Sequence, residues 1–310
     1  MHYLITGAAG FIGSNLVKTL NERGVSDIIA VDEMTDGDKH QNLADCQIAD
    51  FIDLADFGEI CARFHSLGNI KAVIHNGACA DTMENNGRLM MAKNFTYAKN
   101  VFYWCRRFNL PFVYASSASV YGVGKISREE PQCERPINMY AYSKLAFDQF
   151  IRKNIAAANN TVVGLRYFNV YGARETTKGK MASMVSQLYW QLRAGGEAKL
   201  FTGTDGYPDG GQMRDFVNVR DVANVDLFFA DRPTTVKGIF NVGTGKARSF
   251  NEVAQLLIKR LGRGKIEYVP FPEKLAGKYQ SFTEADLTAL RAAGYDADFL
   301  PLEKGIDCYF

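Results

Sequence analysis

The feature that most constrains this chain is a glycine-rich turn, with Gly7, Gly10 and Gly13, between a predicted strand at residues 3–6 and a predicted helix at residues 11–23. The first glycine allows a tight turn, the second lets the backbone approach a pyrophosphate closely, and the third lets the helix pack against the strand. The amino end of the helix adds N–H groups and a partial positive charge, which suit phosphate oxygens. A turn of this spacing between a strand and a helix predicts a dinucleotide-binding βαβ unit.

An acidic residue, Asp32, ends the next predicted strand at residues 28–32. A carboxylate at this position can accept a hydrogen bond from a ribose 2′-hydroxyl, which indicates NAD, and it would repel a 2′-phosphate. Lys39 follows in a polar loop, however, and its ammonium group could neutralise a 2′-phosphate. The residue types alone therefore leave the choice between NAD and NADP open.

The rest of the first half alternates strands and helices. Further strands are predicted at 71–75, 111–115 and 160–167, and a helix at 87–108. Strands that are apolar on both faces and alternate with helices predict an α/β fold with a doubly wound parallel sheet. After about Gly172 strands and helices alternate less regularly. Helical patterns at 181–193, 222–230, 250–261 and 303–310 are mixed with short strands and with Gly- and Pro-containing turns. We expect a Rossmann domain at 1–172, its sheet completed by segments near 214–245, and a smaller α/β substrate-binding lobe formed mainly by 173–310.

Composition narrows the function classes. The 310 residues carry 36 Lys and Arg against 34 Asp and Glu, a net charge of +2, which gives no reason to expect a nucleic-acid-coating protein. No apolar run approaches the roughly 18–20 residues of a membrane-spanning helix, and no basic segment precedes an apolar one as in a signal peptide. The six cysteines lack C-x-x-C spacing, so we expect free thiols in a reducing cytoplasm and no bound metal.

A phenol and an amine have the spacing needed for proton transfer. Tyr140 and Lys144 stand one helical turn apart and share a helix face. A nearby ammonium group favours the phenolate and is expected to lower the pKa of the phenol. Ser116 directly follows a predicted apolar strand, at the edge where doubly wound sheets bind ligands, and its hydroxyl could contact a substrate oxygen.

Together with three later segments, these residues resemble the extended short-chain dehydrogenase/reductase family that acts on nucleotide sugars. The segments are Arg-Tyr-Phe-Asn-Val-Tyr-Gly at 166–172, Arg-Asp-Phe-Val-Asn-Val-Arg-Asp at 214–221 and Asn-Val-Gly-Thr-Gly at 241–245. Within that family, residues 75–79, 178–183, 201–204 and 279–283 are most similar to the branch of epimerases that act on an ADP-heptose. The likeness runs nearly from end to end.

The resemblance implies a tightly held NADP, a cytoplasmic homo-oligomer that is usually a pentamer, and a place in lipopolysaccharide inner-core synthesis. It implies Ser116, Tyr140 and Lys144 as the oxidoreductase triad and Lys178 as a second acid/base. The expected cofactor contacts are Gly7, Gly10, Phe11, Ile12, Gly13, Asp32, Glu33, Lys39, Asn76, Gly77, Ala78, Cys79, Ala80, Asn94, Lys144 and Val170. The expected ADP-heptose contacts are Ser116, Asn169, Lys180, Gln187, Phe201, Thr202, Gly203, Thr204, Arg214 and Tyr279.

Several positions depart from the pattern of the family. Leu54 stands where a cofactor-contacting Lys is common, Asn76 replaces a Glu, and Lys93 replaces an Asn. Near the substrate, Lys180 and Gln187 replace a Ser and a His, and the loop at 205–213 looks longer than usual. These departures leave open the details of the ligand contacts and the cofactor preference. They affect the expected type of reaction less.

The implied reaction is an epimerisation through a transient ketone, with Tyr140 serving one epimer and Lys178 the other, in an order that the residues do not fix. A 4-epimerase remains open because it uses the same triad, although Lys178 disfavours it. A dehydratase would need a carboxylate pair after the strand, and residues 116–119 contain none. A non-catalytic NADP-binding regulator typically lacks the Tyr or the Lys, and both are present here.

Overall fold

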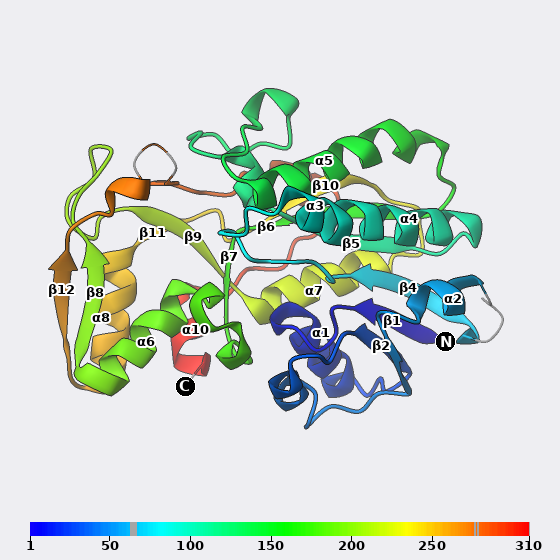
Figure 1. Cartoon of the computed structure of the whole chain (residues 1–310), viewed down its shortest axis with the longest axis horizontal. Helices are drawn as coiled ribbons and strands as arrows, with labels where there is room; N and C mark the ends of the chain where they lie inside the picture. The colour runs from blue at the N-terminus through cyan, green and yellow to red at the C-terminus, as the bar shows by residue number, and fades with distance from the viewer. Residues whose placement is uncertain (63–66, 276, 278, 310) are drawn as a thin grey trace. The chain divides into compact units, whose positions relative to one another are not determined.

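A seven-stranded sheet, in the order β10-β6-β5-β4-β1-β2-β3, forms the framework of the described chain (Figure 1). The computed structural model describes residues 1–62, 67–275, 277 and 279–309. The strands are β1 (His2–Thr6), β2 (Ile28–Asp32), β3 (Asp50–Asp53), β4 (Ile70–His75), β5 (Phe112–Ser117), β6 (Val162–Tyr167) and β10 (Lys237–Val242). Strand β1 pairs in parallel with β2 on one side and with β4 on the other, so the chain changes its winding direction beside β1. The predicted α/β fold class with a doubly wound parallel sheet is confirmed, and ligands bind such sheets at the carboxyl ends of the strands near this switch.

Helices cover both faces of this sheet. They are α1 (Phe11–Glu22), α2 (Phe57–Ala62), α3 (Gly87–Met90), α4 (Tyr97–Arg107), α5 (Met139–Asn154) and α7 (Val219–Ala230). On one face, Leu4, Val73 and Phe112 of the strands belong to the same buried cluster as Phe102 of α4 and Phe147 of α5. In Figure 1, α4 and α5 lie on one side of the sheet and α1 lies on the other.

Several elements differ from the sequence prediction. Strand β3 was not expected, because it lies at the sheet edge and Ile52 is its one buried residue. The helix expected at 181–193 is α6 (Met184–Gly195), which starts later because Ser183 caps its first turn by accepting a hydrogen bond from the Ser186 N–H. The helix expected at 303–310 is α10 (Leu302–Tyr309), and Phe310 lies outside the described residues.

The helix expected at 87–108 is interrupted by a π-helical turn, Met91–Thr96, between α3 and α4. Such turns are frequent at functional sites. Here the turn contains Asn94, which is 2% exposed and uses its side-chain amide on other parts of the fold. Helical periodicity alone cannot distinguish this turn from a regular one.

The described chain divides into two compact units, each assembled from separate stretches of sequence. Unit 1 comprises Met1–Ser117, Asn138–Arg166 and Val222–Phe240, and unit 2 comprises Ala118–Ile137, Tyr167–Asp221 and Asn241–Phe310. Most of the seven-stranded sheet belongs to unit 1.

Unit 2 is an α/β assembly with two small sheets. Its strands are β7 (Asn169–Tyr171), β8 (Glu197–Phe201), β9 (Met213–Asn218), β11 (Ala247–Ser249) and β12 (Lys265–Val269), and its helices are α6, α8 (Phe250–Leu261), α9 (Thr288–Ala292) and α10. The order β11-β9-β7 forms one sheet, and the parallel pair β12-β8 forms the other (Figure 1). A buried cluster joins Leu188 and Leu192 of α6, Phe216 of β9, and Val253 and Leu257 of α8. A capping box between Ser249 and Glu252 starts α8.

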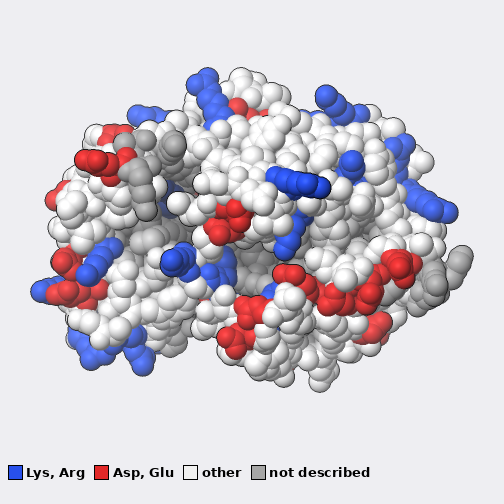
Figure 2. Space-filling model, in the orientation of Figure 1, with Lys and Arg blue, Asp and Glu red and all other residues white. Residues whose placement is uncertain are grey.

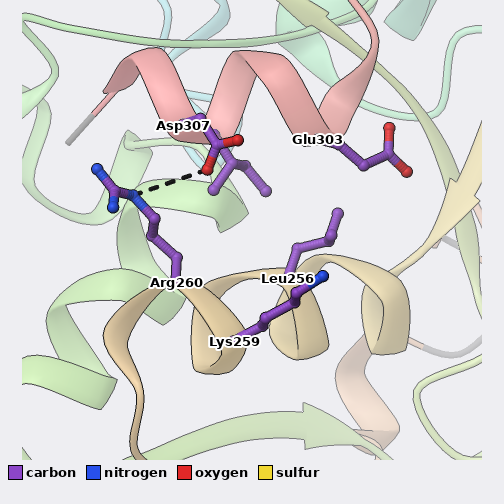
Figure 3. Close-up of a pocket in the computed structure, with 6 residues that line it drawn as sticks. Leu256, Lys259, Arg260, Glu303 and Asp307 are labelled. Atoms are coloured by element: carbon purple, nitrogen blue, oxygen red, sulfur yellow. Dashed lines mark ion pairs between the residues drawn. The ribbon is translucent and has the colours of Figure 1, made fainter.

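Charges of both signs are interspersed over the face in Figure 2, as expected for a net charge of +2. A shallow pocket of about 300 Å³ lies between α8 and α10 of unit 2, with apolar and charged side chains around it (Figure 3). Arg260 Nε and Asp307 Oδ1 are 3.7 Å apart at its rim. No helix in the described part of the chain is long and apolar enough to cross a membrane.

Candidate active site

The glycine-rich turn of unit 1 is packed too tightly for side chains. Gly7 has φ of +68°, and a Cβ there would lie 2.7 Å from the Gly77 backbone nitrogen. A Cβ on Gly13 would lie 2.1 Å from the Gly7 carbonyl oxygen. Gly10 is the N-cap of α1 and donates its own N–H to the Gly7 carbonyl. The backbone, rather than side chains, therefore forms the surface at the amino end of α1, as a pyrophosphate site requires.

Asp32 ties this turn to the end of β2. Its Oδ2 accepts a hydrogen bond of 2.7 Å from the Ala9 N–H, and its Oδ1 accepts one from Lys39 Nζ at 2.5 Å. The Lys39 ammonium group also donates to the Glu33 carbonyl at 2.7 Å. The buried side chain of Asn42, which the sequence analysis did not single out, donates to the Ala9 carbonyl. An ammonium group thus already balances the charge of Asp32 at the place where a ribose 2′-position is expected.

The segment after β4 is fixed by Asn94 of the π-helical turn. The Asn94 side chain accepts a hydrogen bond from the Cys79 N–H at 2.8 Å and donates one to the Cys79 carbonyl at 3.0 Å. Its amide nitrogen also donates to Ser143 Oγ on α5. At the start of the segment, the Gly77 N–H donates to Thr6 Oγ1. Predicted cofactor contacts at 76–80 are therefore held beside the glycine-rich turn and α5.

Tyr140 and Lys144 lie one turn apart on α5, as their spacing predicts, and Tyr140 is partly buried whereas Lys144 is buried. Burial raises the pKa of Tyr140, while a hydrogen bond with the Ser117 side chain opposes that rise. Burial lowers the pKa of Lys144 to about 8, against the opposing effect of the Asp148 carboxylate. Lys144 Nζ donates to the Ala115 carbonyl at 2.8 Å. The expected lowering of the Tyr140 pKa by Lys144 is therefore not found, because burial dominates.

Ser116 is not brought to Tyr140. It lies within β5 on the same face as Tyr114, two residues away, and both hydroxyls donate to the Asp148 carboxylate at 2.9 Å. Asp148 is fully buried and pairs with the equally buried Arg166, whose Nη2 lies 2.8 Å from Asp148 Oδ2. The neighbouring Ser117, which the sequence analysis did not single out, is the serine that contacts the phenol of Tyr140. Strand alternation therefore separates two adjacent serines into two different roles.

In unit 2, Lys178 stands in a short 3₁₀ segment, Thr176–Met181. Burial lowers the pKa of Lys178, while the carboxylate of Glu175 opposes this effect. Gly179 follows with φ of +50°, a left-handed conformation that favours glycine. The predicted contacts Lys180 and Gln187 belong to the same region, where Gln187 Nε2 donates to the Lys180 carbonyl at 3.3 Å and to the Ala182 carbonyl at 2.7 Å.

Unit 2 also brings Arg214, Tyr279 and Phe201 together. The Arg214 guanidinium carbon lies 4.9 Å from the ring centre of Tyr279, and the Phe201 and Tyr279 ring centres are 6.3 Å apart. Arg214 is 7% exposed and donates to the Met213 carbonyl, so it is held in place by aromatic and backbone contacts. A planar cation beside aromatic rings suits a phosphate next to a nucleotide base.

The remaining predicted substrate contacts of unit 2 lie near these residues or on β7. Thr202, Gly203 and Thr204 follow β8, and the Gly203 N–H donates to Asp209 Oδ1 at 2.8 Å. Asn169 Oδ1 on β7 accepts a hydrogen bond from Thr283 Oγ1 at 3.3 Å. Within the described ranges, no group of three His, Cys, Asp or Glu side chains could hold a metal ion.

With this geometry in hand, the chain can be compared with known proteins. Residues 3–243 match the NAD dependent epimerase/dehydratase family, and the chain belongs to this family. The ADP-L-glycero-D-manno-heptose-6-epimerase of Alkalilimnicola ehrlichii is 53% identical over 306 residues, which cover 99% of this chain and 95% of that protein. The crystal structure of the enzyme of the same name from Helicobacter pylori is 34% identical with a TM-score of 0.84, covering 99% of this chain and 94% of that one. The UDP-glucose 4-epimerase of Thermus thermophilus, solved with NAD, is 27% identical with a TM-score of 0.78, covering 100% and 99%.

Acid stability should depend on His75, the last residue of β4. Burial, together with the charge of Lys144, lowers the pKa of His75 to about 3. An unfolded chain binds this proton near pH 6.5, so the unfolded state takes up more protons between about pH 6.5 and pH 3, and stability is lost as the pH falls through that window. We expect His75→Gln to flatten the loss between about pH 7.5 and pH 5, measured as the free energy of unfolding in urea. The exposed His40 gives the control: His40→Gln should leave the wild-type pH dependence intact, and an equally steep loss in His75→Gln would contradict the assignment.

Proposed function

We propose that this protein interconverts ADP-D-glycero-D-manno-heptose and ADP-L-glycero-D-manno-heptose by transient oxidation at C6 of the heptose. The observation that carries the proposal is the 53% identity, over nearly the whole of both chains, with a protein named as the 6-epimerase of this sugar. Tyr140 and Lys144 of unit 1 support the oxidation chemistry, because a phenol and an amine one turn apart can accept and return a proton.

The cofactor that we propose is a nicotinamide dinucleotide, with NADP preferred to NAD. The close-packed glycine turn fits the pyrophosphate, because backbone N–H groups and the start of α1 stand where its oxygens would lie. Lys39 Nζ at Asp32 and Lys93 Nζ, 4.0 Å from Glu33 Oε1, supply two ammonium groups near the end of β2 that suit a 2′-phosphate. When bound, the nicotinamide would supply reversible two-electron oxidation of the C6 alcohol. The mass of the nucleotide released on denaturation distinguishes NADP from NAD.

The proton steps in this proposal belong to the chain's own side chains. Tyr140 exchanges a proton with the C6 oxygen of one epimer, and Lys178 does so with that of the other. Ser117, through its hydrogen bond with Tyr140, favours the phenolate and can share a hydrogen bond with the same oxygen. Ser117 therefore replaces Ser116 in the proposed triad. Lys144, one helical turn from Tyr140, would add a buried amine that can reach the nicotinamide ribose.

For substrate binding we propose that Arg214, Tyr279 and Phe201 hold the ADP part. A guanidinium group is a permanent, planar cation that can bind a phosphate with two hydrogen bonds, and the aromatic rings offer faces for a base. We also propose that the protein acts in lipopolysaccharide inner-core synthesis, assembles as a homo-oligomer such as a pentamer, and is located in the cytoplasm. These three parts of the proposal rest on the resemblance.

A 4-epimerase acting on a UDP-sugar is the second candidate. The 27% identity and TM-score of 0.78 with the Thermus thermophilus enzyme favour it, since that enzyme's fold is shared over the full length. Lys178 argues for the 6-epimerase, because the resemblance to that branch of the family gives this residue the role of a second acid/base. The two candidates differ in which nucleotide sugar is converted.

The purified protein, with no cofactor added, should convert ADP-D-glycero-D-manno-heptose to its L-glycero epimer.

Tyr140→Phe and Lys178→Met should each lower turnover by about 10²-fold or more, because each removes a positioned acid/base. The exposed Tyr142 on the same helix and the exposed Lys199 on β8 provide matched controls, and Tyr142→Phe and Lys199→Met should retain wild-type turnover. Near-wild-type turnover of Tyr140→Phe or Lys178→Met would remove that residue from the scheme, and conversion of UDP-glucose alone would replace the proposed function by its rival.

The two adjacent serines should respond differently to the same substitution. Ser117→Ala should lower kcat by about 10²-fold, because it removes a hydroxyl that contacts the phenol. Ser116→Ala should lower the free energy of unfolding by about 1 kcal/mol, because it removes a buried hydrogen bond to Asp148, and its effect on kcat should be much smaller. Steady-state kinetics and urea unfolding of both variants test this, and a greater loss of kcat in Ser116→Ala would restore the sequence-based assignment.

A further inference from the structure

The loop that carries Lys178 is organised around a buried carboxylate, that of Glu175. Glu175 is 1% exposed, although an ionised side chain is rarely buried to this extent without partners. Its Oε1 accepts hydrogen bonds of 2.9 Å from the Gly172 N–H and from Ser183 Oγ, and its Oε2 accepts one of 2.5 Å from the Ser183 N–H. Each of these bonds uses a carboxyl oxygen as acceptor, so backbone and hydroxyl donors of the loop hold both oxygens in place.

These bonds join the two ends of the loop. Gly172 follows β7, and Ser183 is the N-cap of α6, so one carboxylate connects the residue that begins the loop to the residue that ends it. Between them, the Lys178 N–H donates to the Glu175 carbonyl at 3.0 Å, which places the lysine in the turn directly after the glutamate. Glu175 therefore fixes the backbone from which the Lys178 side chain extends.

The carboxylate also acts on the amine by its charge. Lys178 is partly buried, which disfavours its ammonium form, and the negative charge of Glu175 favours it. The other charged side chains beside Lys178 in this loop are Arg174 and Lys180, which carry the same sign as Lys178 and cannot supply this stabilisation. Glu175 is therefore the acidic residue of this loop that favours the ammonium form of Lys178.

We propose that Glu175 is the positioning residue of Lys178, which holds the loop in place and keeps the amine in its ammonium form until it gives a proton to the substrate. The inference rests on the proposed function and adds to it the group that sets the protonation state of the second acid/base. Glu175 acts through Lys178 and contacts neither substrate nor cofactor in this proposal.

The test measures the protonation of Lys178 without any substrate. The intact protein is treated briefly with acetic anhydride across a range of pH, and acylation of Lys178 and of the exposed Lys180 is quantified on the same peptide by mass spectrometry. In Glu175→Gln the midpoint for Lys178 should move to lower pH, so that its labelling relative to Lys180 rises several-fold at neutral pH. Loss of the negative charge leaves the neutral, reactive amine more populated.

Two further variants separate charge from loop structure. Ser183→Ala removes a hydrogen bond to Glu175 and the cap of α6 but keeps the carboxylate, so it should lower stability and leave the Lys178 midpoint unchanged. Glu175→Asp keeps the charge but shortens the side chain by one methylene. It should therefore shift the Lys178 midpoint in the same direction as Glu175→Gln, but by less. This variant replaces Glu175→Gln in the test if Glu175→Gln does not fold. An unchanged or higher midpoint in both Glu175 variants, or an equal shift in Ser183→Ala, would overturn the inference.

Kinetics then separate the inference from the proposed function. If Lys178 gives its proton to the substrate, the basic limb of the pH profile of kcat/KM for the ADP-heptose should move to lower pH in Glu175→Gln together with the labelling midpoint, because the required ammonium form is lost at lower pH. If the labelling midpoint shifts and the basic limb does not move, Glu175 still controls the protonation of Lys178, and Lys178 is removed from the proposed reaction.

Discussion

The buried ion pair between Arg166 and Asp148 is the interaction on which the candidate site of unit 1 depends. Both side chains are fully buried, and Asp148 also accepts hydrogen bonds from Tyr114 and Ser116, so β5, β6 and α5 are joined at one carboxylate. Removal of either charge would leave the other uncompensated in the interior, which is strongly destabilising. Because Lys144 stands one turn before Asp148 on α5, and Tyr140 one turn earlier still, this ion pair fixes the part of α5 that carries the residues proposed to transfer protons.

The amines of Lys144 in unit 1 and Lys178 in unit 2 have similar electrostatic surroundings. Burial lowers the pKa of Lys144 in unit 1 and of Lys178 in unit 2, and in each case a buried carboxylate on the same element or loop opposes the effect. Asp148 and Glu175 are themselves held by several hydrogen-bond donors. Burial brings the pKa of each amine closer to neutral pH than that of a fully solvated lysine, which remains charged.

Much of unit 1 could be predicted because local spacing determines it. The positions of Gly7 and Gly13, Asp32 at a strand end, and a phenol one turn from an amine are all visible in the sequence. The choice between Ser116 and Ser117 could not be predicted, because it depends on which face of β5 each side chain occupies and on Asp148, 32 residues after Ser116. The raised pKa of Tyr140 could not be predicted either, because the spacing of charged residues can be read from a sequence whereas burial cannot.

The most direct test of transient oxidation follows the hydrogen at C6. If the hydrogen leaves the carbon and returns to it on a bound nicotinamide, conversion of ADP-D-glycero-D-manno-heptose in D₂O should yield the L-glycero epimer with no deuterium at C6, as measured by NMR. Deuterium at C6 would contradict the account, because it would mean that the carbon exchanges a proton with solvent during inversion.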